Sequence, residues 1–460
     1  MNKNPLTHVK STPVTNIGNK LGARPNLIFL LILAAISLAG CDRFDSRATG
    51  PRELPVADAS HAGFSAERLS HLTEYLEQAL QEKDTPGAVA LILRDGQVVY
   101  EQAFGHRTPA REQAMTIDTI FRIYSMTKPI TSVAVMMLWE EGAFNLNDPV
   151  AMYLPEFRDT RVAIKDETQS NIVDTVTPLR PITIHDLLRH TSGMTYGIFG
   201  AMTAVKQQYL DAELTMDTFD GDLPQWVETV ARIPLEAHPG ERWEYSPSPT
   251  VLGRLVEVVS GQKFGEFLRD RLFNPLDMLD TDFYVPAAKH DRMAEGFGLN
   301  LRGHFEELHP VATPPKLQPG DSGLVSTARD YARFSQMILN GGELNGIRLL
   351  SPKTVDLMTS NHLGPDIDKG PSYLPGDGYG FGLGFSVRLE QGVSALAGSP
   401  GDFGWGGLAG TFGWVDPQEQ LVLILMVQDI RHLFLYRSRF RSLAYAALTR
   451  KQESGERDVR

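Results

Sequence analysis

Residues 125–128 read Ser-Met-Thr-Lys and follow a strand-like run at 119–123, Thr-Ile-Phe-Arg-Ile. Pro129 suits the first turn of a helix, where its missing N–H costs little, and residues 130–138 are apolar enough to continue that helix in a buried position. Positions i and i+3 share one helix face, so the Ser125 hydroxyl and the Lys128 amine would lie side by side. Serine becomes a good nucleophile when a neighbouring base takes its proton, and a lysine in a buried, cationic environment can be that base. The stretch therefore predicts a nucleophilic serine at the start of a buried helix.

The same spacing occurs a second time, as Ser260-Gly261-Gln262-Lys263. This copy ends an apolar run at 252–259, and its glycine is typical of a helix C-cap and turn. A turn would splay the serine and lysine side chains apart. We therefore expect the copy at Ser125 to be the functional one.

Two distant segments accompany Ser125 and Lys128: Tyr245-Ser246-Pro247, within Trp-Glu-Tyr-Ser at 243–246, and Trp405-Gly406-Gly407. In this order the three motifs resemble those of the serine β-lactamase and penicillin-binding-protein superfamily. The closest likeness is to the family VIII carboxylesterases, which are of class C β-lactamase type. The resemblance covers roughly residues 64–448. Flanking segments that fit the same family lie at residues 122–124, 190–193, 323–327 and 412–417.

This resemblance implies an α/β (α+β) fold of the β-lactamase/transpeptidase type, in which an antiparallel sheet is flanked by helices. An all-helical lobe, at about 145–300, would be inserted into the sheet lobe of a single domain at 61–450. The residue patterns agree, because Asp95-Gly96 predicts a hairpin and the apolar periodicity predicts several helices. We expect helices at 64–81, 184–189 (capped by Thr183), 223–231, 249–259, 330–340 and 435–449. We expect strands at 87–94, 97–104, 379–387, 412–415 and 421–427.

The resemblance also implies roles for single residues. Ser125 would be the nucleophile, and either Lys128 or Tyr245 would accept its proton; the sequence leaves this choice open. By position, the backbone N–H groups of Ser125 and Leu408 would form the oxyanion hole. Trp405, Gly406 and Gly407 would bind substrate, because glycines let a ligand lie against bare backbone.

Two departures from the family pattern bear on the substrate. Trp405 stands where β-lactamases and peptidases place a cation that holds the substrate carboxylate, and an indole offers apolar area and one N–H instead. Pro247 replaces the usual Asn or Ser, and its ring cannot bind the side-chain amide of a β-lactam. Both changes favour a neutral, apolar acyl group.

Other features exclude whole classes of function. The net charge of −12 argues against nucleic acid as a partner. The chain has no His-Glu-x-x-His motif, so we expect no metal, and no organic cofactor is implied. It also lacks G-x-S-x-G, which argues against an α/β-hydrolase. The resemblance makes His190-Thr191-Ser192-Gly193 a structural turn rather than part of a catalytic triad.

The first 40 residues are typical of a bacterial lipoprotein signal peptide. A basic, polar stretch leads into the apolar run 27–38, which is too short to span a bilayer comfortably, and then into Leu38-Ala39-Gly40-Cys41. Cys41 is the only cysteine, and acylation would give its thiol a use. We expect a lipid-anchored protein of the bacterial cell envelope that faces the periplasm, on either membrane, with a polar tether at 41–60 and a polar tail at 451–460.

The sequence thus predicts a serine hydrolase, most simply a carboxylesterase that forms an acyl-enzyme on Ser125 with a small-molecule, short-chain ester. The alternatives are a β-lactamase or D-Ala-D-Ala carboxypeptidase, a transacylase, and a non-catalytic lipoprotein that uses the fold to bind cell-wall fragments. The physiological substrate and the oligomeric state stay open.

Overall fold

The computed structural model describes residues 53–82, 85–110, 112–215, 218–295, 310–370 and 372–450. All of them belong to one compact unit at 50–460. The predicted signal peptide, Cys41, most of the predicted tether and the predicted polar tail lie outside the described residues. In the part that is described, none of the helices has the length and apolar character needed to cross a bilayer.

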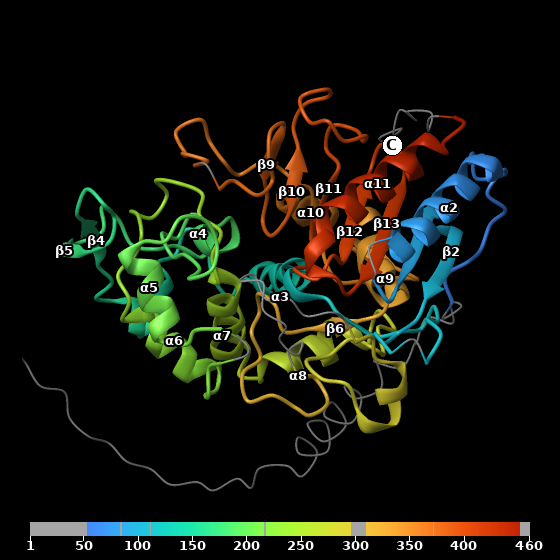
Figure 1. The fold of residues 1–460 in the computed structure, drawn as a ribbon. Coiled ribbons are helices and arrows are strands. Elements are labelled where there is room, and N and C mark those ends of the chain that lie inside the picture. Colours follow the sequence, from blue (N-terminus) through green and yellow to red (C-terminus); the bar gives the residue numbers. More distant parts are fainter. Residues whose placement is uncertain are drawn as a thin grey trace, which may run out of the picture. The chain divides into compact units, whose positions relative to one another are not determined.

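The centre of the fold is a seven-stranded sheet in the order β2-β1-β13-β12-β11-β10-β9, in which every neighbouring pair is antiparallel (Figure 1). Strands β1 and β13 come from opposite ends of the chain and pair over seven residues, from Ala88–Val427 to Arg94–Leu421. The fold therefore closes only when its last strand is in place. The strands are β1 (Gly87–Arg94), β2 (Gln97–Gly105), β9 (Tyr379–Phe381), β10 (Ser386–Arg388), β11 (Phe403–Gly406), β12 (Phe412–Asp416) and β13 (Leu421–Val427).

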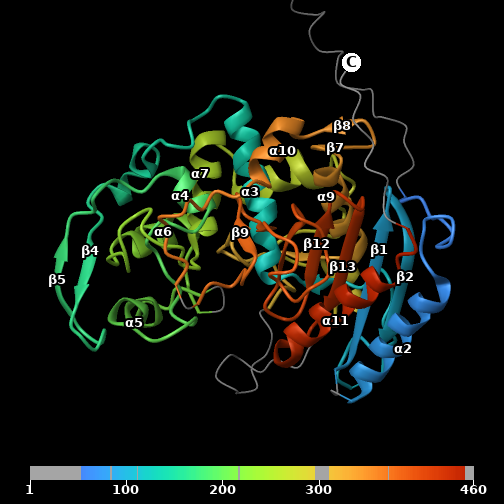
Figure 2. The same ribbon diagram turned by 90° about the horizontal axis from the view of Figure 1, so that it is seen from above.

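Helices cover both faces of this sheet. On one face, α2 (Ala66–Glu82) and α11 (Leu433–Ala446) pack together against alternate residues of β1 and β13. On the other face, α9 (Ala328–Leu339) covers the remaining alternate residues, and α3 (Thr127–Glu140) belongs to the same apolar core (Figure 2). Side chains of a strand point alternately to its two faces. This explains why β1 and β13, buried on both faces, are continuous apolar runs.

The inserted lobe lies between β2 and the later strands in sequence. Its helices are α4 (Ile184–Leu188), α5 (Ala204–Asp211), α6 (Leu223–Ala231), α7 (Ser248–Ser260) and α8 (Phe264–Leu268). The lobe is not purely helical, because β4 (Val162–Lys165) and β5 (Ile172–Val176) form an antiparallel pair within it. The prediction of an antiparallel sheet flanked by helices is otherwise confirmed.

Helix α3 is buried along nearly its whole length, from Thr127 to Leu138. It lies between the inserted lobe and the sheet in both views (Figures 1 and 2). An α-helix that is apolar all round belongs inside a protein rather than on its surface. Its N-terminus carries Ser125 and Lys128, so the buried packing of α3 fixes the position of both.

Short elements complete the described part of the chain. They are β3 (Phe121–Arg122) paired with β6 (Val325–Ser326), β7 (Glu343–Leu344) paired with β8 (Ile347–Arg348), and α10 (Pro352–Met358). The strand expected at 119–123 is thus reduced to two residues.

The single strand expected at 379–387 is wrong. The segment forms two strands, β9 and β10, which pair with each other. Gly384 has a φ of 91° and turns the chain between them. A side chain on Gly382 would also collide with the Met358 carbonyl, so this glycine allows a close approach to the end of α10.

Candidate active site

Ser125 lies in a 3-10 turn, Tyr124–Met126, immediately before α3. The preceding residue, Tyr124, has a φ of 44°, which is a strained conformation for a bulky side chain. The carbonyls of Ile123 and Met126 hold the turn, because they accept hydrogen bonds from the Thr411 hydroxyl (3.3 Å) and the Tyr331 hydroxyl (3.1 Å). Ser125 is thus a half-buried serine on a turn that hydrogen bonds hold in place.

The three side chains predicted to act together do converge. The Tyr245 hydroxyl donates a hydrogen bond to the Ser125 Oγ at 2.8 Å. The Lys128 Nζ donates to the same oxygen at 3.2 Å and lies 4.6 Å from the centre of the Tyr245 ring. Lys128 is 1 % exposed and Tyr245 is 7 % exposed, so bulk water screens their interaction only weakly. Tyr245 lies in the irregular segment just before α7, and its hydrogen bond to Ser125 places it at the N-terminus of α3.

A carboxylate that the sequence analysis missed lies behind Lys128. The Lys128 Nζ donates to the Asp321 carbonyl at 2.8 Å and is 4.0 Å from the Asp321 Oδ2. Hydroxyls of Thr250 (2.6 Å) and Tyr196 donate to that carboxylate. Burial, reinforced by the charge of Asp321, holds the pKa of Tyr196 well above its ordinary value, so Tyr196 stays a neutral donor. No local motif marks Asp321; its only signal is its place just before the Gly323 segment.

Aromatic side chains surround the Tyr245 ring. The Trp405 indole donates its N–H to the Tyr245 hydroxyl oxygen at 3.3 Å. The Tyr245 hydroxyl thus has one neighbour that donates to it and one oxygen, that of Ser125, that accepts from it. The buried members of this cluster are Trp243, Tyr245, Leu363, Phe381 and Trp405, with Tyr196, Phe199, Ile367 and Tyr373 packed against them.

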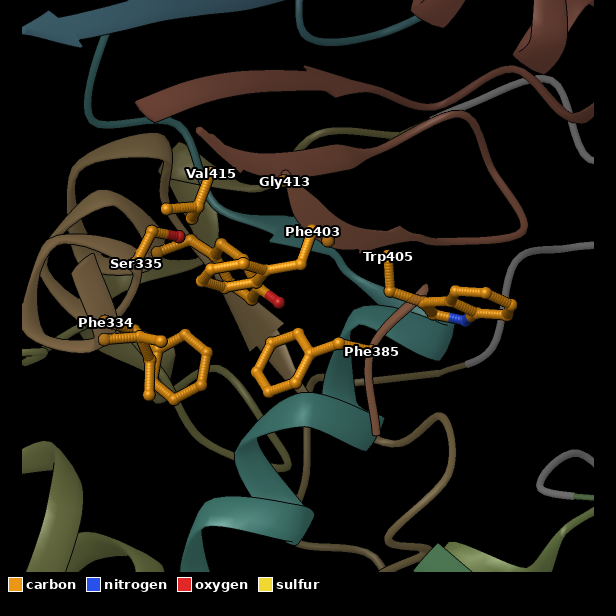
Figure 3. Close-up of a pocket in the computed structure, with 10 residues that line it drawn as sticks. Phe334, Ser335, Phe385, Phe403, Trp405, Gly413 and Val415 are labelled. Carbon is orange, nitrogen blue, oxygen red and sulfur yellow. The ribbon is translucent and has the colours of Figure 1, made fainter. Parts of the chain in front are cut away.

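A separate apolar pocket lies behind this site. Phe334 and Ser335 of α9, Phe385, and Phe403 of β11 are among the residues that line it. Figure 3 shows the aromatic rings of Phe334 and Phe385 facing one another, with the Trp405 indole turned away from them. Trp405 lines both this pocket and the cluster around Tyr245, whereas Ser125 and Tyr245 do not line the pocket. The pocket therefore lies in the apolar core next to the candidate site.

The glycines after Trp405 are fixed by packing. A Cβ on Gly406 would lie 2.5 Å from the guanidinium carbon of Arg437, and one on Gly407 would lie 2.3 Å from the Ile123 carbonyl oxygen. The Cβ side of each glycine therefore faces protein, and contact with substrate stays a prediction. The close approach of Gly407 to Ile123 brings the following residue, Leu408, beside the turn that carries Ser125.

The whole arrangement matches a known family. The Beta-lactamase family model matches residues 72–447. The chain belongs to the Beta-lactamase family.

The chain is similar to several individual proteins, some of which are named as esterases. The chain is 35% identical over 352 residues to protein Rv1367c of Mycobacterium tuberculosis, covering 74% of this chain and 85% of that protein. It is 31% identical over 394 residues to esterase EstB of Burkholderia gladioli, covering 81% and 92%. Among solved structures, EstCE1, described as a hydrolase with promiscuous acyltransferase activity, superposes with a TM-score of 0.70 at 25% identity, over 82% of this chain and 99% of the other. Esterases are therefore among its relatives.

Two other sequence features of this Beta-lactamase family member have structural explanations. His190 is buried beside the Tyr245 ring (centroids 5.2 Å apart), and its Nδ1 is 3.1 Å from the Ser246 Oγ. Burial, and secondly the Lys128 charge, hold the His190 pKa well below its ordinary value, so the ring is neutral. The second Ser-x-x-Lys copy ends α7, where Gly261 has a φ of 74° and caps the helix as predicted. In the described ranges, no group of three or more His, Cys, Asp or Glu residues is arranged to hold a metal ion.

Proposed function

We propose that this protein is a serine carboxylesterase that hydrolyses small, neutral esters through an acyl-enzyme on Ser125. One observation carries the proposal: the Ser125 Oγ lies within hydrogen-bonding distance of both the Tyr245 hydroxyl (2.8 Å) and the Lys128 Nζ (3.2 Å). A nucleophile in contact with a base, and a base held by a third group, is the arrangement that acyl transfer through a hydroxyl requires.

The reaction would proceed in two halves. In its phenolate form, with its own proton released to water, Tyr245 takes the proton of the Ser125 hydroxyl as the Ser125 Oγ attacks the ester carbonyl, and the carbonyl oxygen gains the negative charge. The backbone N–H groups of Ser125 and Leu408 would stabilise that oxyanion. Neither N–H donates a hydrogen bond to another group in the described part of the chain. Ser125 is the second residue of its turn, so the turn offers its N–H no carbonyl acceptor. The Leu408 N–H likewise has no hydrogen-bond acceptor among the described residues. The alcohol then leaves with the proton, and water cleaves the acyl-enzyme by the same steps.

Lys128 would support Tyr245 through its positive charge, without changing its position. Its Nζ lies over the Tyr245 ring and close to the Asp321 carboxylate. A positive charge beside a phenol favours the phenolate, so Lys128 can support Tyr245 as the base. This assignment of the proton to Tyr245 belongs to the proposal.

The substrate class follows from the lining of the site. Apart from Lys128 and His190, the side chains packed around Tyr245 are aromatic or apolar, and the indole of Trp405 lies near the end of β11. Apolar surface of this kind binds an uncharged acyl group through burial alone. A penicillin or peptide carboxylate would gain nothing from Trp405, which is why the esterase is favoured over a β-lactamase or D-Ala-D-Ala carboxypeptidase.

The experiment is to compare purified parent protein with Ser125→Ala on p-nitrophenyl butyrate and on nitrocefin. We expect the parent to hydrolyse the ester, the variant to lose at least about a thousandfold, and a fluorophosphonate probe to label the parent only. Ser132→Ala is the matched control, because Ser132 is buried on helix α3 and its hydroxyl has no hydrogen-bond partner in the described part of the chain. Equal ester hydrolysis by Ser125→Ala would overturn the proposal, and faster turnover of nitrocefin than of esters would favour a β-lactamase.

We further propose that Cys41 carries a lipid that tethers the enzyme to a membrane of the cell envelope, facing the periplasm. The support is the sequence Leu38-Ala39-Gly40-Cys41 after an apolar run. In a bacterial host, radiolabelled palmitate should enter the parent and not Cys41→Ser, and the variant should leave the membrane fraction. Equal labelling of the two proteins would rule the anchor out.

A further inference from the structure

Arg437 lies against the loop that follows β11. The residue projects from α11, and its guanidinium donates hydrogen bonds to the carbonyls of Gly407 and, at 3.4 Å, Gly410. The same guanidinium fills the space beside Gly406, where a Cβ would meet it at 2.5 Å. Helix α11 thus reaches across the end of β11 and ties both ends of the loop 407–410.

The Gly407 carbonyl and the Leu408 N–H belong to one peptide unit. A trans peptide is planar, and its C=O and N–H point in opposite directions. A group that holds the carbonyl from one side therefore fixes the direction of the N–H on the other side. Gly407 is itself packed against Ile123, two residues before Ser125.

The Arg437 guanidinium forms no ion pair with another side chain among the described residues. No carboxylate lies within ion-pair distance of its guanidinium in the described part of the chain. Burial lowers its pKa to about 10, with the charge of Tyr245 acting in the opposite direction, so at neutral pH it remains a cation. A cation bonded to a carbonyl polarises the peptide, and hydrogen bonds that share a peptide group strengthen one another.

We propose that Arg437 is a positioning residue for the oxyanion hole: it holds the Gly407–Leu408 peptide so that the Leu408 N–H faces the Ser125 Oγ, and it strengthens that N–H as a donor. This inference rests on the proposed esterase function. It assigns Arg437 no contact with the substrate, so its effect falls on the tetrahedral state and not on the bound ester.

The test compares Arg437→Met and Arg437→Lys with the parent on p-nitrophenyl butyrate. We expect Arg437→Met to lower kcat about tenfold to a hundredfold with little change in KM, since a directly removed oxyanion donor costs about a hundredfold to a thousandfold. The Ki for butaneboronic acid, which forms a tetrahedral adduct on serine, should rise by a similar factor. Arg437→Lys keeps the positive charge but not the hydrogen bonds to two carbonyls. Its kcat and boronate Ki should therefore lie between those of the parent and those of Arg437→Met.

Controls separate this role from a merely structural one. Arg439→Met removes an exposed arginine from the same helix and should leave kcat and the boronate Ki unchanged. Millimolar guanidinium should restore part of the activity of Arg437→Ala, which a misfolded variant would not show. The p-nitrophenyl monoester of glutaric acid tests substrate binding: a loss confined to this anionic ester would overturn the proposal in favour of a carboxylate-binding arginine.

The outcomes also separate this inference from the proposed function. A parent that neither cleaves esters nor reacts with a fluorophosphonate would overturn the esterase itself. A reactive parent whose folded Arg437→Met and Arg437→Lys variants keep its kcat and boronate Ki would overturn the role of Arg437 alone.

Discussion

Among the residues described, the indole N–H of Trp405 is the one group that donates a hydrogen bond to the Tyr245 hydroxyl oxygen, over 3.3 Å. Tyr245 acts as the base in the proposed step only as a phenolate, and an indole N–H binds a phenolate oxygen more strongly than a phenol oxygen. The hydrogen bond from Trp405 therefore favours the form of Tyr245 that can take the Ser125 proton. Trp405→Phe keeps an aromatic ring against Phe381 but removes the donor. We expect kcat on p-nitrophenyl butyrate to fall about tenfold, which corresponds to about 1.4 kcal/mol, with KM nearly unchanged.

Trp414→Phe is the matched control for this residue. Trp414 lies on the neighbouring strand β12 and is 6 % exposed against 8 % for Trp405, and its indole N–H has no hydrogen-bond partner among the residues that the structure describes. Its replacement removes no hydrogen bond, so kcat should stay at the parent value. Unchanged kcat in Trp405→Phe as well would show that the indole serves only as packing beside Tyr245.

At the scale of elements, a pair of histidines joins α4 to the segment after α10. The His362 Nε2 is 2.8 Å from the Leu357 carbonyl, so it carries a proton, and its Nδ1 accepts from the His185 Nε2 at 2.9 Å. Burial, with Arg189 next, lowers the pKa of His185 to about 4, and burial also lowers that of His362. The charge of Asp186 raises the pKa of His185, whereas the charge of Arg180 lowers it, as that of Arg189 does.

The sign of the pH effect follows from these directions. Between pH 6.5 and about 4, the unfolded chain binds protons on these rings that the folded protein does not, so stability falls as the pH falls. Above pH 6.5 both rings are neutral in the folded and the unfolded chain, so the pair adds no pH dependence to stability. We expect Tm to fall less in His185→Gln than in the parent over that range, whereas His71→Gln, on an exposed face of α2, should follow the parent. Parallel curves for the parent and His185→Gln would contradict this role.

The elements that the sequence predicted well are those with local signals. Thr183 caps α4 through a capping box, Gly261 ends α7, and Asp95-Gly96 turns between β1 and β2, all as expected. The hairpin at 379–388 was missed because alternating glycines imitate a strand, and only the φ of Gly384 reveals the turn. In the site, motifs located Ser125, Lys128 and Tyr245. Asp321 and Arg437 could not be found, because each reaches the candidate site through contacts that only the tertiary fold creates.

For the molecule as a whole, α3 joins the two lobes in one core. The largest apolar cluster includes Trp226 and Leu255 of the inserted lobe, Ile130 of α3, and Val415 and Ile424 of the sheet. Residues in one continuous core lose their packing together, so unfolding should be a single transition. The residues of the candidate site are divided in the same way, since Tyr245 precedes α7 and Trp405 lies on β11.

Ile130→Ala tests this unity. Ile130 is 0 % exposed, so truncation leaves a cavity at the junction of the lobes and should cost about 2–5 kcal/mol. We expect far-UV circular dichroism and esterase activity to be lost in one coincident transition, shifted to lower temperature. Val258→Ala, at an exposed position of α7, should leave that transition where it is. If activity disappeared well before the helical signal, the inserted lobe would separate from the sheet before unfolding, and α3 would be a hinge rather than a shared core.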